Sequence, residues 1–222
     1  ALGPFRGDAF QIVDADTCTY VNELMFGGGA VKICLAASFE PRGPDALRVR
    51  FETLTFSIFG SALPAVTFPS GTERTWLLTY TDDDVRIVRA GLDGGRSTAR
   101  DLGLIDANEG AAADAYLFVL SRAPEVIAAP RAPSQIAAAL GAPGKRRMLK
   151  EKIRVAAAGS SLGADSSASQ RKEMEALMDQ LGELNPTPRP AVSRLLEGVW
   201  DVVWPTEAEL LYLTRNGSPR LP

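Results

Sequence analysis

Three adjacent carboxylates, Asp82, Asp83 and Asp84, are followed by the arginines Arg86 and Arg89. Paired carboxylates are what general acid–base catalysis requires, and clustered oxygens also bind hard metal ions. No fourth hard ligand is identifiable, however, and three acids between two strands are typical of a solvated turn with local salt bridges. We therefore expect neither a catalytic nor a metal site here, and we assign Asp82, Asp84 and Arg86 a structural role.

Histidine is absent from the chain, which removes Ser-His-Asp and Cys-His catalysis and histidine-bound metals. The two cysteines, Cys18 and Cys34, are too few for a four-thiolate zinc site. If 18–26 and 30–40 form a hairpin, the thiols lie roughly 13 Å apart, which is too far for a disulfide. We expect both to be reduced and buried as small apolar residues. Without a nucleophile–base pair, we expect no enzymatic activity.

Composition sets further limits on function. The chain has 222 residues and a net charge of −3, so no overall positive charge favours nucleic acid as a partner. Nowhere are there about 18 consecutive apolar residues, the length that a membrane-spanning helix needs. A local basic group precedes apolar positions of a predicted helix: Lys145, Arg146, Arg147, Lys150 and Lys152. Such a segment fits an anionic lipid surface or an ordinary solvated helix face, and both interpretations remain open.

Hydrophobic patterning predicts a mainly β chain. Strands are expected at 9–14, 19–26, 30–39, 47–58, 75–80, 84–90, 116–121, 198–204 and 208–213. The triple glycine 27–29 predicts a hairpin turn, and a change of apolar parity near 52–53 predicts a bulge or bend. About ten short strands with tight turns favour a barrel or a sandwich.

The remaining segments are helical or irregular. Helices are expected around 148–156 and over 169–182, where apolar residues recur at helical spacing. Alternate prolines at 186–190 predict an extended arm. Residues 91–115 indicate a long loop, and 123–144 a proline-rich linker around a helical turn at 134–140.

One stretch of the sequence carries a distinctive motif. Glu183-Leu-Asn-Pro-Thr-Pro-Arg-Pro190 is followed by Leu195-Leu-Glu-Gly-Val-Trp-Asp-Val-Val203. This resembles the opening of a plastid lipid-associated (PAP/fibrillin) domain, in which a helix leads into E-x-N-P-x-P-x-P and then into L-x-G-x-W. Residues 76–89 resemble the family's closing W-x-x-x-Y-L-D-x-D-L-R-I-x-R, and residues 117–122 resemble its final strand. The resemblance covers most of the chain outside 91–115 and 123–144.

The order of these motifs departs from the family, because the opening follows the closing and 91–115 is inserted. Joining Pro222 to Ala1 restores the family order. The chain is then a circular permutant or a piece of a tandem repeat; two incomplete half-domains are a third explanation. We expect one barrel from 1–122 and 195–222, with 208–213 close to 9–14. Residues 123–144 would be its linker, and 145–194 its accessory helices and arm.

The fold that the resemblance implies is mainly β, a lipocalin-like antiparallel β-barrel with two accessory helices. Gly198-x-Trp200 also resembles the lipocalin G-x-W, in which the Trp closes the barrel base beneath an arginine, here Arg122 or, as second candidate, Arg89. The barrel interior, or its outer packing, would be lined by Phe10, Ile12, Phe26, Phe39, Phe51, Phe56, Trp76 and Phe118. Whether that interior is open to a ligand or filled by side chains stays open.

The family implies a non-enzymatic plastid protein at thylakoid or plastoglobule surfaces that binds or organises lipids, carotenoids or quinones. No cofactor is required, although a lipid, carotenoid, chlorophyll or quinone would be compatible as a bound molecule. The alternative is a structural subunit docked on a thylakoid photosystem or light-harvesting complex. Residues 91–115 and 123–144 favour this alternative, because loops outside a barrel serve partner contacts.

Overall fold

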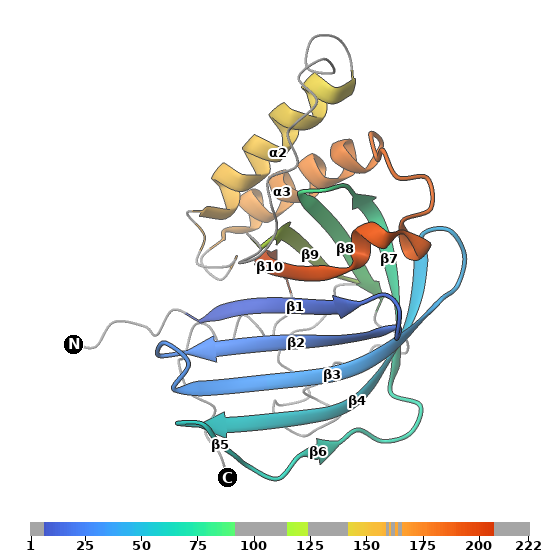
Figure 1. Cartoon of the computed structure of the whole chain (residues 1–222). Helices are drawn as coiled ribbons and strands as arrows, with labels where there is room; N and C mark the ends of the chain where they lie inside the picture. The colour runs from blue at the N-terminus through green and yellow to red at the C-terminus, as the bar shows by residue number, and fades with distance from the viewer. Residues whose placement is uncertain are drawn as a thin grey trace, which may run out of the picture.

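A computed structural model describes residues 7–91, 115–123, 142–158, 160, 163 and 166–206. Eight antiparallel strands form a closed barrel, and two helices cover part of its outer surface (Figure 1). The barrel strands are β1 (Asp8–Asp14), β2 (Thr19–Phe26), β3 (Val31–Pro41), β4 (Ala46–Ile58), β7 (Glu73–Thr81), β8 (Val85–Gly91), β9 (Ala115–Arg122) and β10 (Gly198–Pro205). The expected mainly β fold with a barrel and two helices is confirmed.

Barrel closure joins segments that are far apart in the sequence. The strand order is β3-β2-β1-β10-β9-β8-β7-β4, and β3 also pairs with β4, which closes the circle. β10 lies between β1 and β9, with Phe10 opposite Asp201 and Trp200 opposite Arg122. The early strands and β10 therefore share one barrel. The expected strand 208–213, the turn 134–140 and the insert 92–114 lie outside the described residues.

The predicted hairpin and bulge are both present. Gly27–Gly29 connect β2 to β3, and all three glycines have positive φ. In the β3–β4 ladder Ala36 faces Thr53 and Ala37 faces Phe51, so Glu52 is the extra residue. A bulge of one residue reverses which side chains face inward, which accounts for the parity change in β4. Two further strands of two residues each, β5 (Ser61–Ala62) and β6 (Val66–Thr67), pair with β4.

Two helices, α2 (Ala142–Ala158) and α3 (Ala168–Gly182), pack on the outer face of β7–β10. α2 begins earlier than the apolar pattern predicted, because Pro143 is compatible with the first turn of a helix. The arm expected at 186–190 is followed by two 3-10 helices, η2 (Pro190–Val192), which begins at its last residue, and η3 (Arg194–Leu196). None of the described helices has the length and apolar character that crossing a bilayer demands.

The sheet has apolar residues on both of its surfaces in the helix-covered region. In β8, Val88 and Ala90 point into the barrel, whereas Val85 and Ile87 point outward under the helices. The inner core combines nine aromatic side chains with aliphatic ones. The outer core is completed by Leu149, Ile153, Met174, Met178, Leu181 and Trp204. The helices are therefore integral to the fold.

The N-terminus of α3 is fixed by a capping box. The Ser167 hydroxyl accepts a hydrogen bond from the Gln170 N–H, and the Gln170 side chain accepts one from the Ser167 N–H. We expect Ser167→Ala to lower the free energy of unfolding by about 1 kcal/mol, measured by urea denaturation. Ser70→Ala, in an exposed loop, is the control and should leave stability unchanged. Equal effects of the two substitutions would contradict a capping role for Ser167.

Candidate functional site

The barrel interior holds most of the residues expected to line it. Phe26, Phe39, Phe51, Trp76 and Phe118 belong to one buried cluster, and Phe56 packs against it. Two aromatic contacts join Trp76 to its neighbours, with ring centroids 5.0 Å from Tyr20 and 6.2 Å from Phe118. The inner surface of the barrel is thus a continuous packed core.

Phe10 and Ile12 were wrongly assigned to the lining. Both point away from the interior, and Ile12 is 41% exposed. Gln11 and Val13 take the inward positions of β1. Gln11 is polar, but inside the barrel it donates a hydrogen bond to Asn22 Oδ1 and accepts one from Arg86. The large apolar residues of β1, Phe10 and Ile12, therefore lie on the outer face of the barrel.

One cavity between the described inner side chains is small. A cavity bounded by Gln11, Tyr20, Trp76, Arg86 and Leu196, among others, has a volume of about 10 Å³. A single water molecule needs about 10–15 Å³ of such space. This cavity therefore does not accommodate a lipid, carotenoid or quinone in the conformation described.

Trp200 closes the barrel between two guanidinium groups. Its side chain is fully buried, and its indole N–H donates to the Leu196 carbonyl over 2.9 Å. The guanidinium carbon of Arg122 lies 4.2 Å from the ring centroid, and that of Arg86 lies 4.6 Å away. Cation–π contacts of this kind contribute about 1 kcal/mol or more when desolvated. Arg122 therefore occupies the position expected for a lipocalin-like G-x-W motif.

Arg122 also holds three chain segments together. Its Nε donates to the Asp83 carbonyl, and its two terminal nitrogens donate to the carbonyls of Glu197 and Leu195, all within 2.8 Å. A Cβ atom at residue 198 would come within 2.9 Å of this guanidinium, and Gly198 has a φ of +112°. Glycine is consequently required at this position both for space and for backbone conformation.

Arg89, the second candidate, does not reach Trp200, and the position falls to Arg122, the first candidate. Arg89 forms an ion pair with Asp179 of α3 at 2.5 Å, on the outer face. The second arginine over the indole is Arg86, which sequence reasoning treated as part of the turn. Residues three apart on a strand point to opposite faces, so Arg86 and Arg89 cannot share the interior.

Arg86 is a cation enclosed by the barrel core, with 2% of its surface exposed. Burial, assisted by the nearby charge of Arg122, lowers the pKa of Arg86 to about 9. It donates a hydrogen bond to Gln11, whereas its Nε has no hydrogen-bond partner. Its role in the described structure is to pack on Trp200 and to bind β1.

The aspartate cluster forms the turn between β7 and β8, and α2 contacts it through Lys150. One Asp82 carboxylate oxygen accepts the N–H groups of Asp84 and Val85, as in a solvated turn. The other accepts the Tyr80 hydroxyl and lies 2.5 Å from Lys150 Nζ, which also contacts Asp84 at 3.1 Å. Within the described residues, His, Cys, Asp and Glu form no group of three that could hold a metal ion. The cluster therefore docks a helix.

The electrostatics of this turn follow from burial and hydrogen bonding. Burial on its own would raise the pKa of Asp82, but the hydrogen bonds from Lys150, Tyr80 and the Asp84 N–H outweigh it. The pKa of Asp82 therefore lies below its ordinary value of 3.8. Burial, reinforced by the Asp82 carboxylate, raises the pKa of the Tyr80 hydroxyl. Asp82 is thus held as an anion beside a protonated phenol.

The cysteines are free, as the hairpin geometry predicted, but they are only half-buried. Cys34 faces Glu23, one residue from the expected partner, and burial raises the pKa of its thiol. Cys18 occupies a turn with a φ of +54° just before Thr19, which pairs with Ser38. Neither thiol is a core residue.

The comparisons with known proteins identify one segment of the chain. The family model PAP_fibrillin matches residues 147–221. This segment, about a third of the chain, is similar to the plastid lipid-associated family. No curated protein and no solved structure matches the chain.

The PAP/fibrillin segment comprises most of α2, all of α3, the proline-rich arm and β10. It therefore includes Gly198 and Trp200 but neither Arg86 nor Arg122. The further resemblances at 76–89 and 117–122 lie outside the matched residues, although these strands complete the same barrel as β10. PAP/fibrillin proteins are structural, non-enzymatic and lipid-associated.

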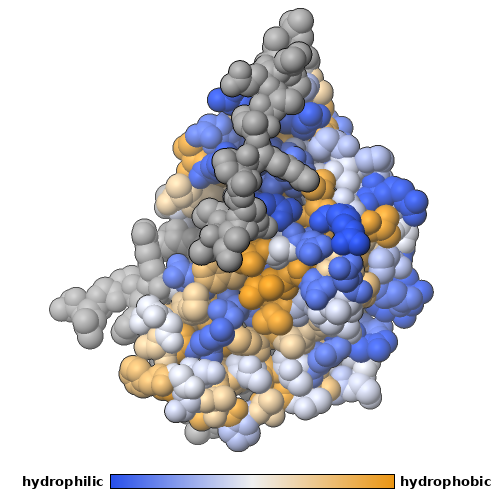
Figure 2. All heavy atoms as spheres, in the orientation of Figure 1, coloured by the Kyte–Doolittle hydropathy of each residue, from blue (hydrophilic) through white to orange (hydrophobic). Residues whose placement is uncertain are grey.

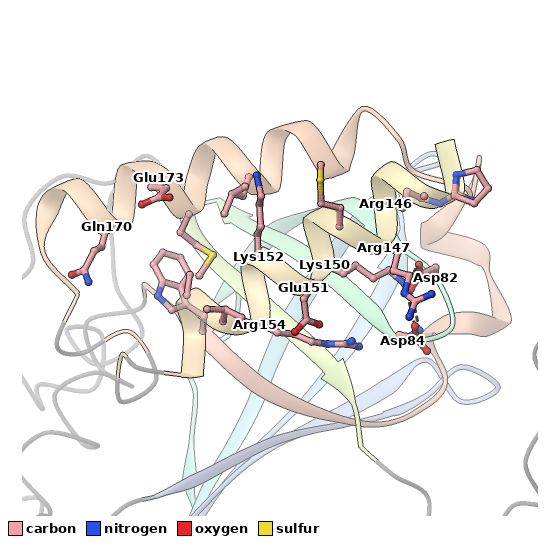
Figure 3. A pocket seen from close by; sticks show the side chains of 18 of the residues that line it. Asp82, Asp84, Arg146, Arg147, Lys150, Glu151, Lys152, Arg154, Gln170 and Glu173 are labelled. Carbon is pink, nitrogen blue, oxygen red and sulfur yellow. Dashed lines mark hydrogen bonds and ion pairs between the residues drawn. The ribbon is translucent and has the colours of Figure 1, made fainter. Parts of the chain in front are cut away.

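A groove of about 1300 Å³ follows α2 and is lined by residues of the matched segment together with Asp82 and Asp84 of the β7–β8 turn (Figure 3). At one end Lys150 and Arg147 lie near Asp82 and Asp84, and Gln170 and Glu173 of α3 line the other end. Its floor includes Met174, Leu177 and Trp204. The groove combines basic, acidic and apolar walls on the surface of the protein.

We expect Trp200→Ala to lower the free energy of unfolding by about 3–5 kcal/mol, since it removes a fully buried indole and leaves two guanidinium groups without their packing partner. A thermal melt measures this effect. Val199→Ala, at the adjacent half-buried position, is the control and should cost far less. An unchanged melting temperature for Trp200→Ala would contradict the closing role of this residue.

We expect Asp82→Asn to lower the free energy of unfolding at pH 7 by about 2 kcal/mol, because it removes a charged hydrogen-bond partner of Lys150. A carboxylate with a depressed pKa stabilises the fold above its unfolded pKa, and this contribution is lost as the pH falls through the folded pKa. The difference from wild type should therefore shrink below about pH 4. Urea denaturation across this pH range is the measurement, with the exposed Asp83→Asn as control. A difference that persists unchanged at low pH would show that the charge of Asp82 is not responsible.

Proposed function

We propose that this is a non-enzymatic plastid protein that binds and organises lipids, carotenoids or quinones at thylakoid or plastoglobule surfaces. The observation that carries the proposal is the family match of residues 147–221, whose family is lipid-associated. The small interior cavity supports contact at the surface of the protein rather than inside the barrel. The matched segment contains a surface suited to such contact.

α2 is strongly basic in a protein whose overall charge is negative. It contains six basic residues, Lys145, Arg146, Arg147, Lys150, Lys152 and Arg154, against the single acid Glu151, which gives a helix charge of +5. The whole chain carries −3. Lys150 is engaged with the aspartate turn, and the side chains of Arg147, Lys152 and Arg154 are exposed. Each such charge contributes about 1 kcal/mol to binding of an anionic lipid surface.

Apolar side chains accompany these charges on the outward face. Met148 and Val155 are 50% and 67% exposed and, seven residues apart, lie on the same side of the helix. The opposite side of α2, formed by Leu149, Ile153 and Ala157, is buried against the barrel. A helix anchored by one face, with basic and apolar residues on the other, has the composition of an interfacial helix.

A second candidate function is a structural subunit docked on a thylakoid photosystem or light-harvesting complex. The groove beside α2 favours it, since acidic residues such as Glu173 and the apolar Trp204 line the groove together with the basic residues. A surface of mixed charge suits a protein partner. Binding to isolated thylakoid membranes, without binding to vesicles made from their extracted lipids, would favour this candidate over the first.

We expect the double substitution Arg147→Glu and Arg154→Glu to weaken binding to vesicles of phosphatidylcholine containing phosphatidylglycerol by at least about 10-fold. Co-sedimentation at low salt measures binding, and added salt should weaken the wild type in the same way. Arg42→Glu with Arg189→Glu changes the net charge equally at exposed sites away from α2 and is the control. If wild type does not bind, the proposal is wrong. If both double variants lose binding equally, overall charge and not α2 is responsible.

A further inference from the structure

The hairpin between β4 and β5 ends in an aromatic residue that points into solvent. Phe59 is 84% exposed, the highest value among the large apolar side chains of the described residues. Ile58, Leu63 and Val66, within the same short segment, are exposed as well. Scattered exposed apolar residues are ordinary, but a contiguous group that includes a nearly free aromatic ring indicates a contact surface.

The conformation of Phe59 is itself unfavourable. Ile58 pairs with Ser61, so Phe59 and Gly60 form a two-residue turn, and both have positive φ, +48° and +80°. This is a type I′ turn, for which Asn-Gly is the preferred sequence. A bulky residue in the left-handed region costs about 1–2 kcal/mol. Phe59 is therefore unfavourable both for its exposure to water and for its backbone, and local folding does not explain its presence.

Charged residues are sparse around the hairpin in the part of the chain that the structure describes, and the Lys32–Glu23 ion pair, with Lys32 opposite Ser57, lies beside it. Residues 53–72 contain no Asp, Glu, Lys or Arg and are bounded by Glu52 and Glu73. The neighbouring β2–β3 turn, from Leu24 to Val31, is also free of charged residues. In Figure 2 the lower edge of the molecule, over β5 and β6, is mainly pale orange and white, and the strongest blue lies elsewhere. Exposed loops of soluble proteins usually carry charges.

The backbone at this tip is well hydrogen-bonded. The Phe59 N–H donates to the Ala30 carbonyl over 2.7 Å, and the Leu63 N–H donates to the Phe56 carbonyl over 2.8 Å. The Phe68 N–H donates to the Glu52 carbonyl over 3.0 Å, and the β4–β5 pairing satisfies further groups. A segment that enters an apolar phase must satisfy its backbone internally, because unpaired groups cost several kcal/mol there. The hairpin meets much of this requirement.

We propose that the β4–β5 hairpin inserts into the apolar layer of a lipid surface, with Phe59 as its anchor. This inference rests on the proposed lipid association and adds a second contact of different chemistry. A lipid layer suits the hairpin because no charged residue lies between Glu52 and Glu73, so the exposed Phe59 ring can enter an apolar phase without burying a charge of its own segment. Aromatic residues are also enriched where proteins meet the lipid–water boundary.

The two contacts lie on different parts of the barrel. α2 covers the outer face of β7–β10, whereas β5 is added to β4, away from the helices (Figure 1). Binding through α2 is electrostatic and screened by salt. Insertion of Phe59 is apolar and persists in salt. The two contributions are therefore separable by lipid composition and ionic strength.

The experiment uses neutral phosphatidylcholine vesicles at high salt, where α2 contributes little. We expect Phe59→Asn to weaken co-sedimentation at least about 10-fold, and also to raise the Tm by about 2–4 °C, because asparagine suits the type I′ turn. Leu77→Thr is the control: it removes an exposed apolar side chain from β7, distant from the hairpin in the sheet, and should leave binding unchanged. Loss of binding together with a gain in stability separates function from folding.

A second variant protects the test against misfolding. In Phe59→Trp, the new indole should show a blue-shifted emission with neutral vesicles and should be quenched by brominated lipid, whereas the three native tryptophans are buried.

Unchanged binding by Phe59→Asn, or no spectral shift in Phe59→Trp, would overturn the inference. Wild-type binding to anionic vesicles alone would overturn it while leaving the proposed function intact. Absence of binding to every vesicle would overturn both. A shift that requires an added protein instead of lipid would assign the hairpin to a protein partner.

Discussion

The whole barrel depends on one aromatic ring held between two cations. Trp200 brings β10 into contact with Arg86 of β8 and Arg122 of β9, and Arg122 in turn fixes the carbonyls of the β7–β8 turn and of the arm that precedes β10. Through Gln11, Arg86 extends this set of contacts to β1. Side chains from β8 and β9, and through Arg86 from β1, thus contribute to the position of β10. Gly198 is fixed by the same requirement, since a larger residue would displace Arg122.

A second constraint on the fold concerns the outer surface of the barrel. Several outward residues of β7–β10 are apolar, among them Val85, Ile87 and Val119, so these strands require a cover, and the PAP/fibrillin segment contributes to it with α3 and most of α2. The Lys150–Asp82 ion pair fixes where α2 lies, and the Arg89–Asp179 pair does the same for α3. The inner face of each helix is consequently occupied by folding contacts. What remains for a lipid or a partner is the outer face of α2 and the uncovered end of β4.

Much of this structure follows from local patterning. Strand alternation located the strands, and a change of parity located the bulge at Glu52, because a period of two is visible wherever the two faces of a strand differ. Alternation did not predict the inward face of β1, because the polar Gln11 points into the barrel. Its side chain forms hydrogen bonds there with Asn22 and Arg86, which are distant in the sequence. The Trp200–Arg122 pair was accessible through the G-x-W pattern, whereas Arg86 was missed although its spacing from Arg89 excludes a shared face. The exposure of Phe59 could not be predicted from the sequence, because an aromatic residue at the end of a strand has the pattern of a core residue.

The position of β10 between β1 and β9 also bears on how the protein folds. Its partners in β1 are distant in the sequence, and contacts of this kind demand a large loss of chain entropy before they stabilise anything. Until β10 arrives, β1 and β9 present unpaired strand edges, which are prone to associate with other chains. The Arg86 guanidinium stays hydrated over the same interval and loses its water only when Trp200 covers it. We therefore expect closure of the barrel to be a late step, with the chain most exposed to aggregation before it.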